Sequence, residues 1–538
     1  MLATAGSAAV PASGGALSEY VRARAAQSGG APSAAAQGFA RALAVEPANE
    51  MLAGQTLAQA LAAGEWRLAS HAASRLDAAG TLPLDGLLFI LSNAVKRGDW
   101  RAADAAVERI EAGRGFTFLT PAIRAWMAFG ARRGDPLSLL GDRQDAAGQA
   151  YQQEHRALLL LAMKRKAEGA GAIAAVSAGA GGRVIRLKLA GAARLARLGE
   201  REPAMALLAG PDEPLVAARN LVASGKAIPG AVDSAADGIA ELFARFAVDL
   251  QRERVTPLAL SFARLSTYLA PDNSETWLVT SELLSADGKI DAALIALDGV
   301  DASDPFAAAA RAIRAQLLVR NGDVATALGE ARLAAAAKVA TPTDLVRYAD
   351  LLAEAKRHAD AAPLYAQAIA RRERGAPGPD LWLLHLLRGS ALEEAGRWPE
   401  AKAALEEAYR IAPQEPQVLN FLGYAQLERR ENLDAAEALI REASRLQPDD
   451  ASITDSLGWA LFRRGKLAEA VATLERASAT DPRQAAIGEH LGDAYWSAGR
   501  RVEARYAWSA AMLHADAEES ARLRAKLESG LSAAVAAP

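Results

Sequence analysis

The side chains best able to do chemistry in this chain are six histidines and many carboxylates, because the sequence contains no cysteine. That absence excludes disulfides, thiolate-bound zinc, iron–sulfur clusters and a cysteine nucleophile. The tightest group of potential metal ligands is His490 with Glu489 and Asp493, since residues four apart share one face of a helix. No H-E-x-x-H pair accompanies them, so we interpret all three as ordinary polar residues of a helix and expect no metal site.

Motifs for other reactions are also missing. No G-x-x-x-x-G-K-S/T phosphate loop occurs, and neither Lys-Ser nor Lys-Thr follows the glycine-rich run at 169–182. The serines lack the G-x-S-x-G context of a nucleophile elbow. Carboxylates such as Glu406 and Glu407 fit solvated helix faces, although an acid–base pair among them stays open as an alternative. We therefore expect a protein that is not an enzyme, with no catalytic residues and no cofactor.

Composition indicates a helical protein. Of the 538 residues, 51% are hydrophobic but only 5% are aromatic, so most of the apolar content is aliphatic, with alanine prominent. With 61 Lys and Arg against 64 Asp and Glu, the net charge of −3 gives no overall basic field for nucleic-acid binding. The longest apolar run, Ala157–Met163, is far shorter than the roughly 20 residues of a membrane span, so no transmembrane segment is expected.

A repeat organises the elements that must position these residues. Small residues recur at Gly389, Gly423, Gly458 and Gly492, at spacings of 34, 35 and 34. The same register continues backwards through Ala349, Ala315, Ser281 and Ala247, and near the start through Gly30, Gly64 and Gly98. Each unit reads as two helices: a small residue lets their backbones approach, and a later proline such as Pro413 ends the second helix. Stacked pairs cover one another's apolar faces, which predicts an all-α solenoid.

The 34-residue period with this pattern resembles the tetratricopeptide repeat (TPR), strongly over 235–515, clearly over 17–112 and loosely between. The runs 420–424, 455–459 and 490–496 are similar to a group of bacterial TPR proteins, many of them exported to the cell envelope. That resemblance favours a periplasmic location, with 1–16 as the remnant of a signal peptide. The alternatives are a disordered tail and a cytoplasmic protein.

The register divides the chain into segments. We expect a tail at 1–16, N-terminal repeats at 17–112, a degenerate helical region at 113–233 with an irregular stretch at 169–182, central repeats at 234–374, a loop at 375–380, C-terminal repeats at 381–515, a capping helix at 516–532 and a tail at 533–538. In the capping helix, Leu523 and Leu527 share one face, whereas Arg522, Arg524 and Lys526 are expected largely outside it.

In a TPR stack the first helix of each pair lines the concave groove. The resemblance therefore implies groove positions three before, one after, and four or five after each glycine. These positions are Asn420, Tyr424 and Glu428, then Asp455, Trp459, Phe462 and Arg463, then Glu489, Asp493 and Trp496. The spacing of 455, 459 and 462 also places those three on one helix stripe. The alternative is that Trp459 and Trp496 are core residues between repeats.

The groove chemistry predicts a non-enzymatic scaffold or adaptor that binds a protein or peptide segment. TPR domains that bind a free C-terminal carboxylate need Lys, Asn and Arg in these positions. Here Asp455, Glu489 and Asp493 stand there, so we expect a partner segment with basic and apolar residues. The alternative function is an accessory to envelope polysaccharide or cell-wall assembly or export, with aromatic residues that bind glycan. The partner's identity, the pathway and the oligomeric state stay open.

Overall fold

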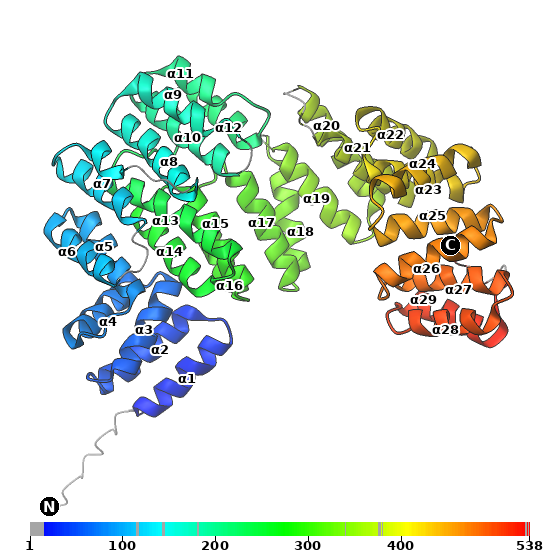
Figure 1. The fold of residues 1–538 in the computed structure, drawn as a ribbon, viewed down its shortest axis with the longest axis horizontal. Helices are drawn as coiled ribbons and strands as arrows, with labels where there is room; N and C mark the ends of the chain where they lie inside the picture. The colour runs from blue at the N-terminus through cyan, green and yellow to red at the C-terminus, as the bar shows by residue number, and fades with distance from the viewer. Residues whose placement is uncertain are drawn as a thin grey trace, which may run out of the picture. The chain divides into compact units, whose positions relative to one another are not determined.

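The computed structural model describes residues 15–113, 118–141, 146–179, 182–338, 340–374, 378, 380–532, 535 and 537. Over these residues the chain forms 29 α-helices and one short 3-10 helix, with no strand (Figure 1). The all-α helical-repeat prediction is therefore confirmed. Most of the expected tail at 1–16, of the expected loop at 375–380 and of the tail at 533–538 lies outside the described residues.

The chain divides into an N-terminal unit, Met1–Asp344, and a C-terminal unit, Leu345–Pro538. The first half of the N-terminal unit contains α1 (Ala16–Ser28), α2 (Pro32–Val45), α3 (Glu50–Ala63), α4 (Trp66–Ala79), α5 (Leu84–Arg97), α6 (Trp100–Ala112), α7 (Thr120–Ala131), η1 (Pro136–Leu140), α8 (Ala146–Ala162) and α9 (Lys166–Val176). Its second half contains α10 (Gly182–Arg197), α11 (Arg201–Leu207), α12 (Glu213–Ala223), α13 (Ala235–Arg252), α14 (Thr256–Leu269), α15 (Ser274–Ala286), α16 (Ile290–Leu297), α17 (Ala307–Arg320) and α18 (Val324–Ala336).

The boundary between the units falls inside α19 (Pro342–Glu354), so the central segment expected at 234–374 spans it. The C-terminal unit continues with α20 (His358–Arg374), α21 (Leu381–Glu394), α22 (Trp398–Ile411), α23 (Pro416–Glu428), α24 (Leu433–Leu446), α25 (Ala451–Arg463), α26 (Leu467–Thr480), α27 (Ala485–Ser497), α28 (Arg501–Ala511) and α29 (Ala517–Ser529). No described helix is by itself long and apolar enough to span a membrane; only the pair α4 and α5, bent by 117°, passes when both are counted together.

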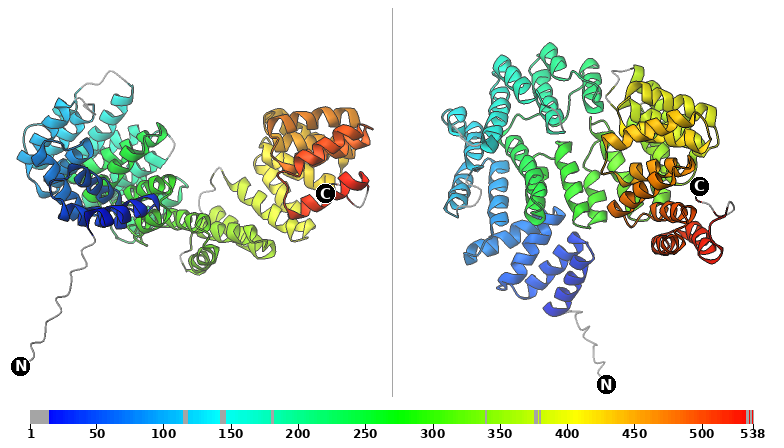
Figure 2. Two further views of the ribbon diagram at one scale, coloured as in Figure 1. Left: turned by 90° about the horizontal axis from the view of Figure 1, so that it is seen from below. Right: turned by 45° about the vertical axis from the view of Figure 1, so that its right-hand side comes forward.

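The N-terminal unit is more than a row of neighbouring pairs. Helices α13 and α14 pack against α3, α5, α7 and α8, which precede them by 70 to 200 residues of chain (Figures 1 and 2). A simple solenoid would have each pair touch only the next. In this unit, the first helices of the early pairs are instead covered by later helices of the same chain.

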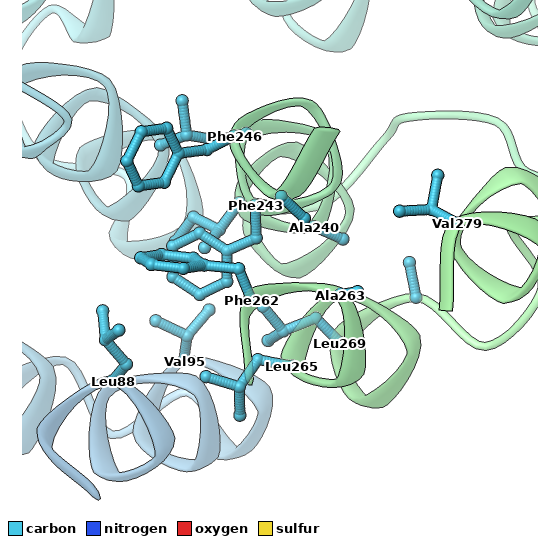
Figure 3. Close-up of a cluster of buried hydrophobic side chains, with 14 of the residues drawn as sticks. Leu88, Val95, Ala240, Phe243, Phe246, Phe262, Ala263, Leu265, Leu269 and Val279 are labelled. Atoms are coloured by element: carbon cyan, nitrogen blue, oxygen red, sulfur yellow. The ribbon is translucent and has the colours of Figure 1, made fainter. Parts of the chain in front are cut away.

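Aromatic side chains fill the centre of this packing. Phe262 of α14 meets Phe243 and Phe246 of α13 edge-on, with ring centroids 5.0 and 4.9 Å apart. Leu88 and Val95 of α5 face the same cluster (Figure 3). Nearby, Tyr268 of α14 lies 4.7 Å from the ring of Trp66 and donates a hydrogen bond of 3.1 Å to Asn93. The early repeats and α13–α14 thus share one core.

The same unit also contains a buried cluster of charged residues, which lies on the side of α8 and α10. Glu241 of α13 is fully buried and accepts hydrogen bonds from Arg183, at 2.7 Å, and from Asn273, at 2.8 Å. Arg186, itself 3% exposed, also pairs with Glu241. Burial would raise the pKa of Glu241, but Arg186 and Arg183 outweigh it and hold that pKa well below its usual range.

One expectation for this unit is wrong. The stretch 169–182 was expected to be irregular, yet α9 runs through its first half to Val176. Gly169 shows why glycine is present, because a Cβ there would lie 2.5 Å from a methyl group of Leu161. The glycine allows close packing of α9 on α8 and does not break the helix.

The C-terminal unit follows the repeat register closely. Helices pair as α21–α22, α23–α24, α25–α26 and α27–α28, and α29 ends the stack. Each anchor glycine faces the second helix of its own pair: a Cβ at Gly389 would lie 2.6 Å from Leu405, at Gly423 2.8 Å from Ala436 and at Gly458 2.5 Å from Leu474. These glycines set how closely the helices of each pair approach.

We therefore predict that Gly458→Ala destabilises the chain relative to Gly54→Ala. Both glycines lie inside helices, so both substitutions gain about 1 kcal/mol of helix propensity. Only Gly458 meets a neighbour, since nothing lies within 4 Å of a Cβ at Gly54. Overpacking should separate the two variants by about 1–3 kcal/mol in urea unfolding followed by circular dichroism. Equal stabilities would show that the glycine anchor is not needed for packing.

Candidate functional site on the C-terminal repeats

The expected groove residues lie on the first helices of three successive pairs, α23, α25 and α27. The structure leaves four of them half-buried: Asn420, Tyr424, Phe462 and Trp496. Four others are buried, namely Asp455, Trp459, Glu489 and Asp493. The side chains of Glu428 and Arg463 pair with each other at 3.1 Å and are each 26% exposed. The set is thus divided between surface and interior.

Trp459 lies in the middle of a three-ring stack and is 1% exposed. The ring of Phe462 stacks on the Trp459 indole with the centroids 4.8 Å apart, and the ring of His490 from the next repeat stacks on it with the centroids 4.2 Å apart. Both rings lie within 17° of parallel to the indole. The indole Nε1 donates a hydrogen bond of 3.2 Å to Glu428 of the preceding repeat. Trp459 therefore joins three repeats, as the core alternative for this residue described.

Carboxylates on each first helix are paired with cations of the next first helix, in what we call the inter-repeat ladder. Its members are Glu393 with Arg429 at 2.6 Å, Glu428 with Arg463 at 3.1 Å, Asp455 with His490 at 2.8 Å, Glu489 with Arg522 at 3.0 Å and with Lys526 at 2.7 Å, and Asp493 with Lys526 at 2.8 Å. The acid comes from the earlier repeat in every pair. The ladder is thus directional along the chain.

The expected acidic groove is therefore not free to attract a basic partner. Asp455, Glu489 and Asp493 are each neutralised from within the unit. Burial raises the pKa of Glu489, but Arg522 and Lys526 outweigh it and lower that pKa overall. For Asp493 burial prevails, and its pKa is raised despite Lys526. The charges of these residues serve packing between repeats.

The position of Lys526 corrects a second expectation. It was placed largely outside the apolar face of the capping helix, yet its side chain is 0% exposed. Helix α29 begins with a capping box between Asp516 and Glu519, and Leu523 is buried against α28. Lys526 lies one turn after Leu523, and its ammonium group donates hydrogen bonds to the buried carboxylates of Glu489 and Asp493. Helix α29 thus caps the stack electrostatically as well as by apolar contact.

Two buried acceptors on this face have no donor within the described part of the chain. They are Asn420 Oδ1 on α23 and Asp455 Oδ1 on α25, which occupy equivalent positions of adjacent repeats. The half-buried ring of Tyr424 packs in the same cluster as Trp459 and Phe462. Burial raises the pKa of Tyr424, and the nearby Glu428 and Asp455 raise it further, so its hydroxyl stays protonated.

Sequence reasoning missed the residues that complete the ladder: His490, Arg522 and Lys526. A signal was present, because each follows its acidic partner by 33 to 37 residues, close to one repeat. Within the described ranges, no three His, Asp or Glu side chains are grouped so as to hold a metal ion. The buried His490 ring instead pairs through its Nδ1 with a carboxylate oxygen of Asp455.

We predict that Lys526→Met strongly destabilises the C-terminal unit. The substitution would leave Glu489 and Asp493, 2% and 0% exposed, without their shared cation. Breaking such a buried pair costs about 3–5 kcal/mol. Arg524→Met on the exposed face of the same helix is the control and should change stability by less than about 0.5 kcal/mol. Equal unfolding midpoints for the two variants in guanidinium would refute electrostatic capping.

The pairing of His490 with Asp455 predicts a pH dependence of stability. Burial lowers the pKa of His490, but Asp455, with Asp493 and Glu489 nearby, outweighs it and raises that pKa above the usual value. The stabilisation that protonated His490 gives by pairing with Asp455 is therefore complete below about pH 6.5. It is lost as the pH rises through the pKa of His490 in the folded state.

Thermal unfolding from about pH 6 to about pH 9 should show a falling midpoint in the parent chain and a flatter profile in His490→Gln. The control His514→Gln, at an exposed histidine of the same unit, should keep the parent slope. A slope that survives His490→Gln would contradict the assignment.

Residues 386–451 and 456–520 match the family model of the tetratricopeptide repeat. No curated protein matches the sequence. Similar solved structures include a tetratricopeptide repeat protein from Parabacteroides merdae, with 16% identity and a TM-score of 0.39 over 47% of this chain and 97% of that chain. Yeast Tom70 has 12% identity and a TM-score of 0.37 over 96% and 95% of the two chains.

A tetratricopeptide repeat protein from Thermus thermophilus has 20% identity and a TM-score of 0.30, over 35% of this chain and 98% of that chain. The family match covers the helix pairs whose anchor glycines are closely packed, Gly389 through Gly492. The match and the paired helices together identify residues 386–451 and 456–520 as tetratricopeptide repeats.

Proposed function

We propose that the chain is a protein-interaction scaffold whose C-terminal repeats hold an extended segment of a partner protein along α23 and α25. The tetratricopeptide fold supports a role in protein–protein interaction in general. The observation that carries the specific proposal is the pair of buried acceptors without donors, Asn420 Oδ1 and Asp455 Oδ1, beside the aromatic ring of Tyr424.

Leaving a buried acceptor unsatisfied costs about 1–3 kcal/mol, so both atoms favour a ligand that brings donors. Main-chain N–H groups of an extended segment are such donors. Helices in contact lie roughly 8–10 Å apart, and a polyproline-type segment returns to the same face every third residue, after about 9.3 Å. Since α23 contacts α25 directly, one such segment could donate to Asn420 and Asp455 together.

The proposed location of the partner surface follows from which first helices are covered by other helices of the chain. In the N-terminal unit, the first helices α3, α5, α7 and α8 pack against α13 and α14. That leaves the C-terminal repeats as the better candidate for a partner. There we assign direct contact to Asn420, Tyr424, Asp455 and Phe462, with Glu428 and Arg463 at the edge. We assign a supporting role to the buried Trp459, Glu489 and Asp493 and to Trp496.

The partner chemistry differs from that expected of an acidic groove. Because Asp455, Glu489 and Asp493 are already paired with cations, they favour an uncharged segment over a basic one. Glycan binding has little support, since both faces of the Trp459 ring are covered by Phe462 and His490. The resemblance to exported bacterial proteins stays a prediction.

The proposal predicts that Tyr424→Ala weakens binding of peptides selected against the full chain from a displayed random library. Truncating an aromatic anchor costs on the order of 2 kcal/mol, or about thirtyfold in Kd by fluorescence anisotropy. The matched control is Tyr409→Ala on α22, a tyrosine that is 37% exposed. Asn420→Ala should also weaken binding, by about fivefold, because a charge-free hydrogen bond contributes about 1 kcal/mol.

Selected peptides that bind Tyr424→Ala and Asn420→Ala as tightly as the parent would place the binding surface elsewhere. Circular dichroism of each variant must match the parent, so that lost binding is not lost folding. Failure of any library peptide to bind the parent chain would count against the proposal.

A further inference from the structure

The N-terminal unit contains a basic cavity where α5, α7 and α8 end close to the start of α13. Its volume is about 890 Å³, within the range of about 300–1,000 Å³ that is usual for ligand sites. The half-buried side chains of Trp100, Phe129 and Met163 form part of its wall. Its charged lining consists of one carboxylate, Asp233, and five cations, Lys96, Arg97, Arg132, Lys164 and Arg194.

Two of the five cations are used within the chain. Arg194 pairs with Asp233 at 3.3 Å, and Lys96 donates a hydrogen bond to the main-chain carbonyl of Tyr268. Asp233 also pairs with Arg197, at 2.7 Å. The single carboxylate of the lining is therefore already neutralised and leaves the other cations of the cavity without a counter-charge.

Those other cations are Arg97, Arg132 and Lys164. All three are exposed, and none forms an ion pair with a carboxylate of the described residues. They follow one another at spacings of 35 and 32 residues, close to one repeat, and lie at the ends of α5, α7 and α8. Since α7 contacts α8, the last two cations stand at the ends of neighbouring helices.

The backbone at two of these cations is strained. Arg132 and Lys164 have φ values of +54° and +65°, in the left-handed region that favours glycine. Gly64 and Gly98 occupy that conformation after α3 and α5, at φ values of +75° and +68°. The chain thus keeps a cation at two turns of this cavity where glycine would fit with less strain, which points to a role for the charge.

Other anions fit the cavity less well. The main-chain donors at the start of α13, which would hold a compact phosphate, are already occupied by the capping box of Ser234 and Asp237. Trp100 packs on Gly130, where a Cβ would lie 2.4 Å from its ring, so that the ring is partly covered and poorly placed to stack on a nucleobase. The net charge of −3 also opposes a polynucleotide.

We propose that this cavity binds an acidic segment of a partner protein. Its carboxylates pair with Arg97, Arg132 and Lys164, and its apolar side chains lie against Trp100 and Phe129. An extended polyproline-type segment returns to the same face every third residue, after about 9.3 Å, which matches the roughly 8–10 Å between helices in contact. The site is separate from the surface proposed on α23 and α25 and does not rest on it.

The test measures binding of the labelled peptide Glu-Leu-Ser-Glu-Phe-Ser-Glu-Leu-Ser to the full chain by fluorescence anisotropy. We expect the double variant Arg132→Gly and Lys164→Gly to bind about tenfold more weakly, because each exposed ion pair contributes about threefold in affinity. Glycine adopts a positive φ without strain, so the variant should melt no lower than the parent by circular dichroism. Binding to the parent should weaken in high salt.

The matched control is the double variant Arg254→Gly and Lys356→Gly. Both residues are exposed, both have a φ of +61°, and neither lines the cavity. This variant loses the same charge and the same backbone strain, so we expect it to bind the peptide as tightly as the parent does. Tyr424→Ala, on the surface proposed for the other partner, should also leave this affinity unchanged.

Several outcomes would overturn the proposal. They are no binding of the peptide to the parent, equal losses in the two double variants, or equal affinity for a peptide with Gln in place of each Glu. Loss of the acidic peptide in Tyr424→Ala would place it on the C-terminal repeats instead. An oligodeoxythymidylate that displaces the peptide and itself binds the cavity variant more weakly would assign the cavity to nucleic acid.

Discussion

A buried carboxylate needs a cation, and for the buried acids of α25 and α27 that cation comes from the following helix pair or from α29. Asp455 depends on His490, and Glu489 and Asp493 depend on Lys526, while the half-buried Glu428 pairs with Arg463 in the same direction. Because isolated buried charges are so costly, no repeat of this unit is complete without its successor. The stack can therefore end only at a helix that brings cations without leaving new buried acids, and α29 meets that condition.

The two units cover their first helices in different ways. In the N-terminal unit, α13 and α14 pack onto α3, α5, α7 and α8, with Phe243, Phe246 and Phe262 at the centre and Glu241 held by arginines. In the C-terminal unit, α29 packs on α27 and α28, and its Lys526 pairs with the buried carboxylates of α27.

The helix pairs were predictable because close packing at an anchor such as Gly458 needs a residue without a side chain, which is visible as a local pattern. The burial of the expected groove residues was less predictable from the sequence. Trp459 is buried by His490, 31 positions later, and Lys526 is buried by acids of α27, so helix periodicity alone assigns both to the wrong side. The packing of α14 on α3 joins segments about 200 residues apart, and no repeat register contains that information.

The direction of the ladder has a consequence for assembly. A block of repeats with acids at one end and bases at the other has unlike ends that attract each other, so identical blocks would join head to tail. Such heterologous contacts do not close on themselves unless the rotation per copy permits, and they otherwise produce open filaments. By carrying Arg522 and Lys526 on the same chain, α29 blocks the acidic end. The capping helix thus leaves neither Glu489 nor Asp493 without a cation at this end of the stack.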